Sequence, residues 1–145
     1  LSGMTYMEHL QDNLRALAPY EPLSGREMEV LKAALNVFLT QSNIRCTTCG
    51  YCMPCPYGVD IPSVFAHFNR CLDDELIPKG TRDPDYEKAR RAYLVEYERS
   101  VPELRQAARC TGCGKCLTHC PQMIAIPDEM ARLGKFVENL RTRQG

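Results

Sequence analysis

The sequence has no long apolar run, no excess of one charge and no familiar catalytic motif. No apolar stretch approaches the roughly 18 residues of a membrane-spanning helix, so no membrane partner is expected. Lys and Arg number 18, as do Asp and Glu; residues 1–75 hold 5 against 9, and residues 76–145 hold 13 against 9. Neither half is basic enough to indicate nucleic-acid binding. Metalloprotease helix, phosphate loop, nucleophile elbow and paired carboxylates are all missing, so no catalytic residue is predicted within this chain.

Cysteine, in contrast, is abundant, and eight of the nine cysteines fall into two similar runs. Residues 45–56 read RCTTCGYCMPCP, and residues 109–121 read RCTGCGKCLTHCP. Each run contains C-x2-C-x2-C followed by a Cys-Pro pair, which is the pattern that binds an iron–sulfur cube. The two runs therefore predict two 4Fe–4S clusters.

In proteins with two such runs, the fourth ligand of each cluster comes from the other run. The predicted ligands of the first cluster are Cys46, Cys49, Cys52 and Cys120. The predicted ligands of the second cluster are Cys110, Cys113, Cys116 and Cys55. The first run is one residue shorter than the second between its last two cysteines, which leaves the number of ligands unchanged.

Zinc and disulfides are the alternatives for so many cysteines. Structural zinc needs only four ligands and usually draws its cysteine pairs from segments about 15–20 residues apart, whereas here four cysteines lie within residues 46–55. A disulfide framework is disfavoured by the odd number of cysteines and by spacing typical of metal or redox sites in reducing compartments. We therefore expect a cytoplasmic protein.

Four further residues near the runs have less specific interpretations. Cys71 has no partner at metal-ligand spacing and is predicted to be a small buried hydrophobe, because both clusters already have four thiolates. His119 adjoins Cys120, but no ligand position is vacant for it. Tyr51 and Tyr57 flank the first loop and either exclude water from a cluster or pack as ordinary side chains.

The similarity between the two halves continues beyond the cysteines. Residues 55–62 read CPYGVDIP and residues 120–127 read CPQMIAIP. Each half therefore consists of a cluster loop, an Ile-Pro pair and a helix. This duplication predicts an internal repeat with pseudo-twofold symmetry about the cluster pair.

The remaining sequence is helical in pattern, with no convincing strand. Helices are expected over 5–17, from 28 to 39 behind a Ser24/Glu27 capping box, from Pro62 to 72, from Asp83-Pro84 to about 99, and from Pro127 to 140. Ser100 and Glu103 predict a short helix that delivers Cys110. The 54 residues from 56 to 109 are mostly helical in pattern, whereas the small bacterial ferredoxin joins its runs by short β-hairpins. We therefore predict an all-α ferredoxin-like dicluster domain over 44–145, preceded by a segment over 1–43.

The motifs from Cys49 to Pro62 and from Cys113 to Pro127 resemble the C-terminal iron–sulfur extension of the ferredoxin-containing aldo/keto reductases. The short first run is similar to that family's own pattern. The N-terminal residues LSGMTYMEHLQDNL resemble the end of the reductase barrel, where the last strand leads into the last helix. The resemblance extends over essentially the whole chain, which begins with Leu1 rather than methionine.

The resemblance implies that this chain is an accessory domain whose partner is an upstream reductase barrel on the same polypeptide. The family's catalytic residues and its NADP site would lie mainly in that barrel. In the family, the last strand-to-helix turn binds the adenine end of NADP. Asp12 and Asn13 correspond to its Glu-Asn pair, whereas Gly3 and His9 occupy the places of its basic residues.

Two classes of function remain open at the level of sequence. In the first, the chain is an electron-transfer module that passes single electrons between its clusters and either an external carrier or a neighbouring active site. In the second, the clusters hold together a structural or interaction domain and never change oxidation state. Both need the same eight thiolates, so the motif cannot separate them.

Overall fold

The computed structural model describes residues 3–18, 20–40 and 42–143 of the 145-residue chain. The chain divides into two compact units, residues 1–41 and residues 42–145. The sequence placed the corresponding boundary between residues 43 and 44. Leu1 and Ser2, which begin the segment that resembles the barrel end, lie outside the described residues.

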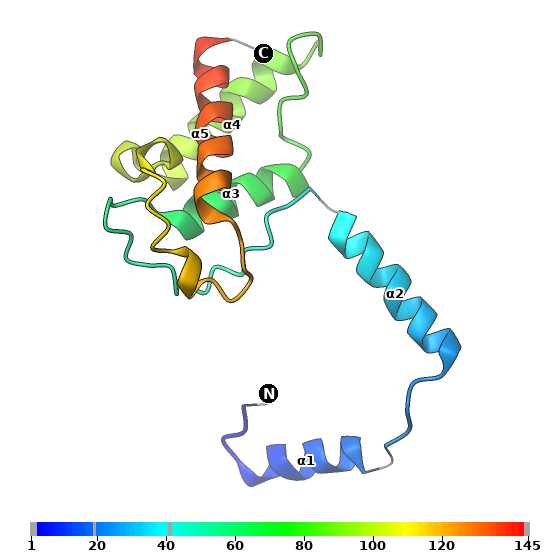
Figure 1. Cartoon of the computed structure of the whole chain (residues 1–145). Helices are drawn as coiled ribbons and strands as arrows, with labels where there is room; N and C mark the ends of the chain where they lie inside the picture. Colours follow the sequence, from blue (N-terminus) through cyan, green and yellow to red (C-terminus); the bar gives the residue numbers. More distant parts are fainter. Residues whose placement is uncertain (1–2, 19, 41, 144–145) are drawn as a thin grey trace. The chain divides into compact units, whose positions relative to one another are not determined.

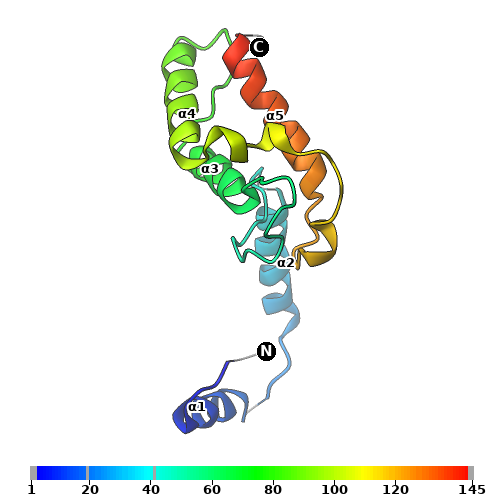
Figure 2. The ribbon, with the colours of Figure 1, turned by 90° about the vertical axis from the view of Figure 1, so that its left-hand side faces the viewer.

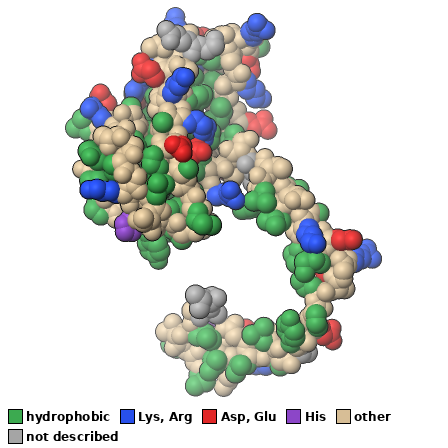
Figure 3. Space-filling view, viewed as in Figure 1, with side chains coloured by type: hydrophobic (Ala, Val, Ile, Leu, Met, Phe, Trp, Pro, Cys, Tyr) green, Lys and Arg blue, Asp and Glu red, His purple; other side chains and the backbone are tan. Residues whose placement is uncertain are grey.

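The first unit consists of the helices α1 (Met7–Leu17) and α2 (Gly25–Thr40). The capping box is present before α2: the Ser24 N–H donates to Glu27 Oε2 over 2.8 Å, and the Glu27 N–H donates to Ser24 Oγ over 3.3 Å. Residues 3–6, where the resemblance places the end of a barrel strand, contain no strand. Neither helix has a buried residue, and their large apolar side chains lie at the surface (Figure 3).

The second unit contains α3 (Ile61–Asp73), α4 (Tyr86–Ser100) and α5 (Ile126–Thr142), together with three 3-10 turns (Figures 1 and 2). The turns are η1 (Glu103–Arg105), η2 (Ala107–Arg109) and η3 (Leu117–His119). The part of the chain that the structure describes is helical and contains no strand, which confirms the predicted all-α class. None of the described helices is long and apolar enough to cross a membrane.

The helices α3 and α5 begin in the same way. Each starts at an isoleucine that is followed by a proline within the first two helical positions, where the missing proline N–H would have no helical partner anyway. The Asp60 side chain accepts a hydrogen bond from the Ser63 N–H over 3.3 Å and so caps α3. Both helices therefore start immediately after a cysteine loop, as the repeat in the sequence predicted.

The core of the second unit lies between α3, α4 and α5. Tyr93 of α4 meets His67 of α3 and Phe136 of α5 edge to face, with ring centroids 4.7 and 5.2 Å apart. A Cβ added at Gly134 of α5 would lie 3.5 Å from the backbone of Ala108, so the absence of a side chain lets α5 pack closely on η2. This packing fixes the direction in which the chain enters the second cysteine loop.

The predicted capping of a short helix by Ser100 and Glu103 is wrong, although short 3-10 helices do lead to Cys110. Ser100 is the last residue of α4, because the Val101 N–H still bonds to the Tyr97 carbonyl over 2.8 Å. The Ser100 hydroxyl accepts instead from Arg70 of α3 over 3.1 Å. Two 3-10 turns then lead to Cys110, the first of them with Pro102 at its N-cap.

Candidate metal centre

The two cysteine loops lie side by side at the end of the unit where α3 and α5 begin (Figures 1 and 2). The Asp60 N–H donates to the Arg105 carbonyl over 2.9 Å, and the Arg105 guanidinium lies 3.3 Å from the Asp60 carboxylate. These contacts join the end of the first loop to the approach of the second. A backbone hydrogen bond and an ion pair therefore connect the two loops without any contribution from metal.

The start of the first loop is held by a residue that the sequence did not indicate. The Asn69 side chain on α3 accepts from the Ile44 N–H over 2.8 Å and donates to the Ile44 carbonyl over 2.6 Å. Ile44 is buried and stands two residues before Cys46. This two-sided clamp fixes the path by which the first cysteine enters its group.

The two loops share their backbone conformation at matching positions. Thr48 and Gly50 have φ angles of 54° and 77°, and the corresponding Gly112 and Gly114 both have 74°. The Met53 N–H bonds to the Gly50 carbonyl over 2.9 Å, and the Leu117 N–H bonds to the Gly114 carbonyl over 3.0 Å. The left-handed positions turn the chain between successive cysteines, which allows three thiols to face one side.

The first group of thiols lines a narrow cavity of about 20 Å³. Its cysteines are Cys46, Cys49, Cys52 and Cys120. Burial raises the pKa of the Cys46 thiol, opposed by a hydrogen bond from the Thr48 N–H, and the neighbouring charges of Cys49 and Cys120 raise it further. This group combines three cysteines of the first run with one of the second.

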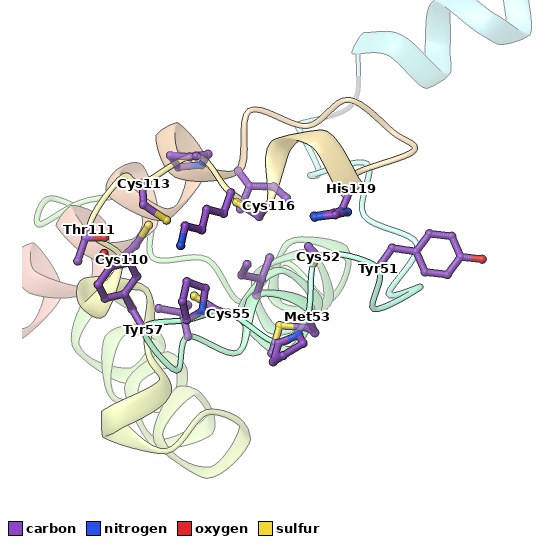
Figure 4. A pocket seen from close by; sticks show the side chains of 18 residues that line it. Tyr51, Cys52, Met53, Cys55, Tyr57, Cys110, Thr111, Cys113, Cys116 and His119 are labelled. Atoms are coloured by element: carbon purple, nitrogen blue, oxygen red, sulfur yellow. The ribbon is translucent and has the colours of Figure 1, made fainter.

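The second group lines a wider cavity of about 320 Å³ (Figure 4). Its cysteines are Cys55, Cys110, Cys113 and Cys116, and Cys52 also reaches its wall. Burial raises the pKa of Cys116, and the charges of Cys110, Cys113 and Cys55 add to the rise. Here three cysteines of the second run meet Cys55 of the first, and Cys52 lines both cavities.

This pairing of two CxxCxxC loops agrees with a comparison against known families. A family model described as a 4Fe-4S dicluster domain matches residues 45–126, more than half of the chain. The chain belongs to this family. It is thus an iron–sulfur domain of the ferredoxin type, as the cysteine spacing predicted. Comparisons with curated proteins and with solved structures gave no match.

The chemistry of the donors fits the clusters of a dicluster domain. All nine cysteines are free thiols, and thiolates are the ligands that iron–sulfur clusters take. Among the described residues, no three His, Cys, Asp or Glu side chains are arranged to hold a single metal ion. A cubane takes one thiolate at each of its four irons, so its ligands need not converge on one point.

Cluster binding depends on pH, because the cysteine thiols must lose their protons before they can bind iron. Burial raises the pKa of Cys52 to about 11, with the charges of Cys46, Cys116 and Cys120 adding to the rise. The metal-free thiol is therefore protonated at neutral pH. Because iron binds thiolates, cluster assembly in this family must release protons from these side chains.

Cys71 is buried at 3 % exposure, away from both groups, as the sequence predicted. Its Sγ lies 3.6 Å from His67 Nε2, which is itself buried, and His67 Nδ1 has no hydrogen-bond partner. Desolvation lowers the pKa of His67 to about 4, helped by the positive charge of Arg70. The pair is therefore a neutral part of the core.

The two tyrosines and the histidine of the loops lie at the margin of the wider cavity. Tyr51, Tyr57 and His119 all line it and are all exposed. In Figure 4 the Tyr51 ring points away from the cavity, whereas the His119 ring is drawn beside Cys52. His119 also lines the narrow cavity. Three further residues line both cavities, which the sequence did not predict: Cys52, Ile61 and Ile126.

Proposed function

We propose that this chain is the electron-transfer domain of an oxidoreductase and holds two 4Fe–4S clusters with crossed ligands. The observation that carries the proposal is that each cavity brings together cysteines of both runs. The narrow cavity gathers three cysteines of the first run with Cys120, and the wider one gathers three of the second run with Cys55 and the shared Cys52. Cys46, Cys49, Cys52 and Cys120 would hold one cluster, and Cys110, Cys113, Cys116 and Cys55 the other. When bound, each cluster accepts and returns one electron.

The closeness of the two groups supports electron transfer over a purely structural role. The Cys52 thiol interacts electrostatically with Cys46 and Cys120 of its own group and with Cys116 of the other. Two clusters held by these residues would lie close enough for an electron to pass between them. One cluster would be sufficient to hold the loops together, so the second is better explained by redox chemistry.

The internal repeat is part of the same proposal. Its support is the series of equivalent backbone features, which extends past the cysteines to Gly58 and Met123, with φ angles of 79° and 51°. The Gly58 N–H bonds to the Cys55 carbonyl over 3.0 Å, and the Met123 N–H bonds to the Cys120 carbonyl over 3.1 Å. A duplicated cluster-binding unit with pseudo-twofold symmetry would have this pattern.

The proposed oxidoreductase is of the aldo/keto reductase type, with its barrel upstream on the same polypeptide. The resemblance of the first residues to the end of that barrel supports this assignment. Exposed apolar side chains on α1 and α2 support it as well, because a partner would bury them. In this arrangement NADP belongs to the barrel, the clusters exchange electrons with an external carrier or the barrel's active site, and the protein is cytoplasmic.

Metal analysis with cysteine variants tests the clusters and their ligands. Anaerobically purified protein should contain about eight iron and eight sulfide per chain. Cys120→Ala should damage the cluster held by Cys46, Cys49 and Cys52, and Cys55→Ala should damage the other. Cys71→Ala is the matched control and should retain both. Stoichiometric zinc without sulfide would refute the clusters, and damage confined to each variant's own run would refute crossed ligation.

Redox titration followed by electron paramagnetic resonance separates electron transfer from a structural role. Dithionite or a ferredoxin-type donor should reduce the clusters reversibly, and coupling between two reduced clusters should broaden the signal. Iron–sulfur potentials span roughly −700 to +450 mV. Clusters that stay oxidised to the low end of that range would favour the alternative, a domain that clusters only hold together.

A further inference from the structure

The wall between the two thiol groups has a buried side made of two equivalent residues. Ile61 and Ile126 line both cavities and are 3 % and 1 % exposed. Each is the first residue of its helix, Ile61 of α3 and Ile126 of α5. The outer side of the wall is formed by His119, which is exposed.

Apolar side chains in this place keep water out of the space between the groups. The Ile126 N–H bonds to the Ile124 carbonyl over 2.8 Å, so this N–H does not require a water molecule as a partner. The strength of an interaction between charges rises as the effective dielectric constant falls. A charge added at one thiol group is consequently felt strongly at the other.

We infer that Ile61 and Ile126 form a dry barrier between the two clusters. Because of this barrier, the two clusters take up their electrons one after the other, at two different midpoint potentials. This inference rests on the proposed function. An external low-potential one-electron donor supplies each electron, and the first electron adds one negative charge to one group. Because the barrier screens that charge poorly, the second electron enters at a lower potential. The isoleucines act as positioning residues, since they bind no iron.

The test is a redox titration of the complete cluster-loaded chain with a hydroxyl placed in the barrier. In Ile61→Thr and Ile126→Thr, the added polarity should attract water and narrow the gap between the two midpoint potentials. The apolar variant Ile61→Val should preserve the gap. Val101→Thr is the matched control, because Val101 is completely buried but lines neither cavity.

A second readout checks that the clusters have not moved. Broadening of the paramagnetic signal in the fully reduced protein depends on the distance between clusters and should be the same in all four variants. Two results would overturn the inference while leaving the proposed function intact. One is an unchanged gap between the midpoint potentials in both Ile61→Thr and Ile126→Thr, and the other is an equal narrowing of that gap in Val101→Thr. Clusters that no donor reduces would overturn both. If Ile61→Thr lost its clusters, Ile126→Thr would decide the outcome.

Discussion

The Thr48 N–H donates a hydrogen bond to the Cys46 Sγ over 3.4 Å, from a residue whose φ angle is 54°. The equivalent residue of the second loop is Gly112, with a φ angle of 74°. A β-branched residue rarely adopts this left-handed conformation. The first loop therefore accepts strain at a position where the second loop uses glycine.

This difference predicts unequal effects of exchanging the two residues. Gly112→Thr should destabilise the cluster-loaded protein by about 1–2 kcal/mol, the penalty for an L-residue in the left-handed region. Thr48→Gly should change stability by less than about 1 kcal/mol, because relief of strain is offset by the greater freedom of glycine in the unfolded chain. Urea unfolding measures both, with iron content as the control for cluster loss. Equal destabilisation by the two variants would contradict this account.

The Asn69 clamp predicts a selective effect on one cluster. Asn69→Ala removes both hydrogen bonds to Ile44 and leaves partly buried backbone groups without their partners, at a cost of about 1–3 kcal/mol. The cluster held by the first run should be lost more readily than the other, measured as iron release to a chelator. Arg70→Ala alters the next residue of α3, which is exposed, and should retain both clusters. Simultaneous loss of both clusters at one rate would show that the clamp has no local role.

The extent to which the sequence predicted this molecule differs between its parts. Local signals were sufficient for the five long helices, since capping residues and prolines act within a few positions of the chain. The predicted cap at Ser100 was wrong because of a tertiary contact, in which Arg70 of α3 donates a hydrogen bond to the serine hydroxyl. The clamp by Asn69 and the shared position of Ile61 were equally inaccessible, since both depend on how α3 packs beside loops distant in sequence.

His67 should make the protein less stable in mild acid. Its pKa is lowered from 6.5 to about 4 in the folded chain, first by burial and then by Arg70. Between these values the unfolded chain binds the proton and the folded chain does not. The contribution of His67 to the pH dependence therefore leaves the free energy of unfolding at its highest above about pH 6.5. The free energy of unfolding then falls progressively as the pH falls towards 4.

The variant His67→Phe should abolish this component of the pH dependence. From pH 7 to pH 5 the wild type should lose about 1–2 kcal/mol relative to the variant, measured by urea unfolding with cluster content followed at each pH. His9→Phe changes an exposed histidine of α1 and should follow the wild type. Parallel curves for wild type and His67→Phe would rule out the buried imidazole as the cause.

Cluster removal should unfold the two cysteine loops while the helical core persists. The loops contain few buried apolar residues, and the narrow cavity of about 20 Å³ brings thiols together that have no other reason to associate. In the core between α3, α4 and α5, Tyr93 packs against His67 and Phe136 through aromatic contacts that involve no cysteine, so we expect this core to persist. Hydrogen exchange before and after anaerobic chelation measures the difference. The amides of Met53 and Leu117, which close equivalent turns in the two loops, should lose protection.

The Val101 amide, which bonds to the Tyr97 carbonyl at the end of α4, is the internal control and should retain its protection. Protection that persisted at Met53 and Leu117 in the iron-free chain would mean that the loops fold without their clusters.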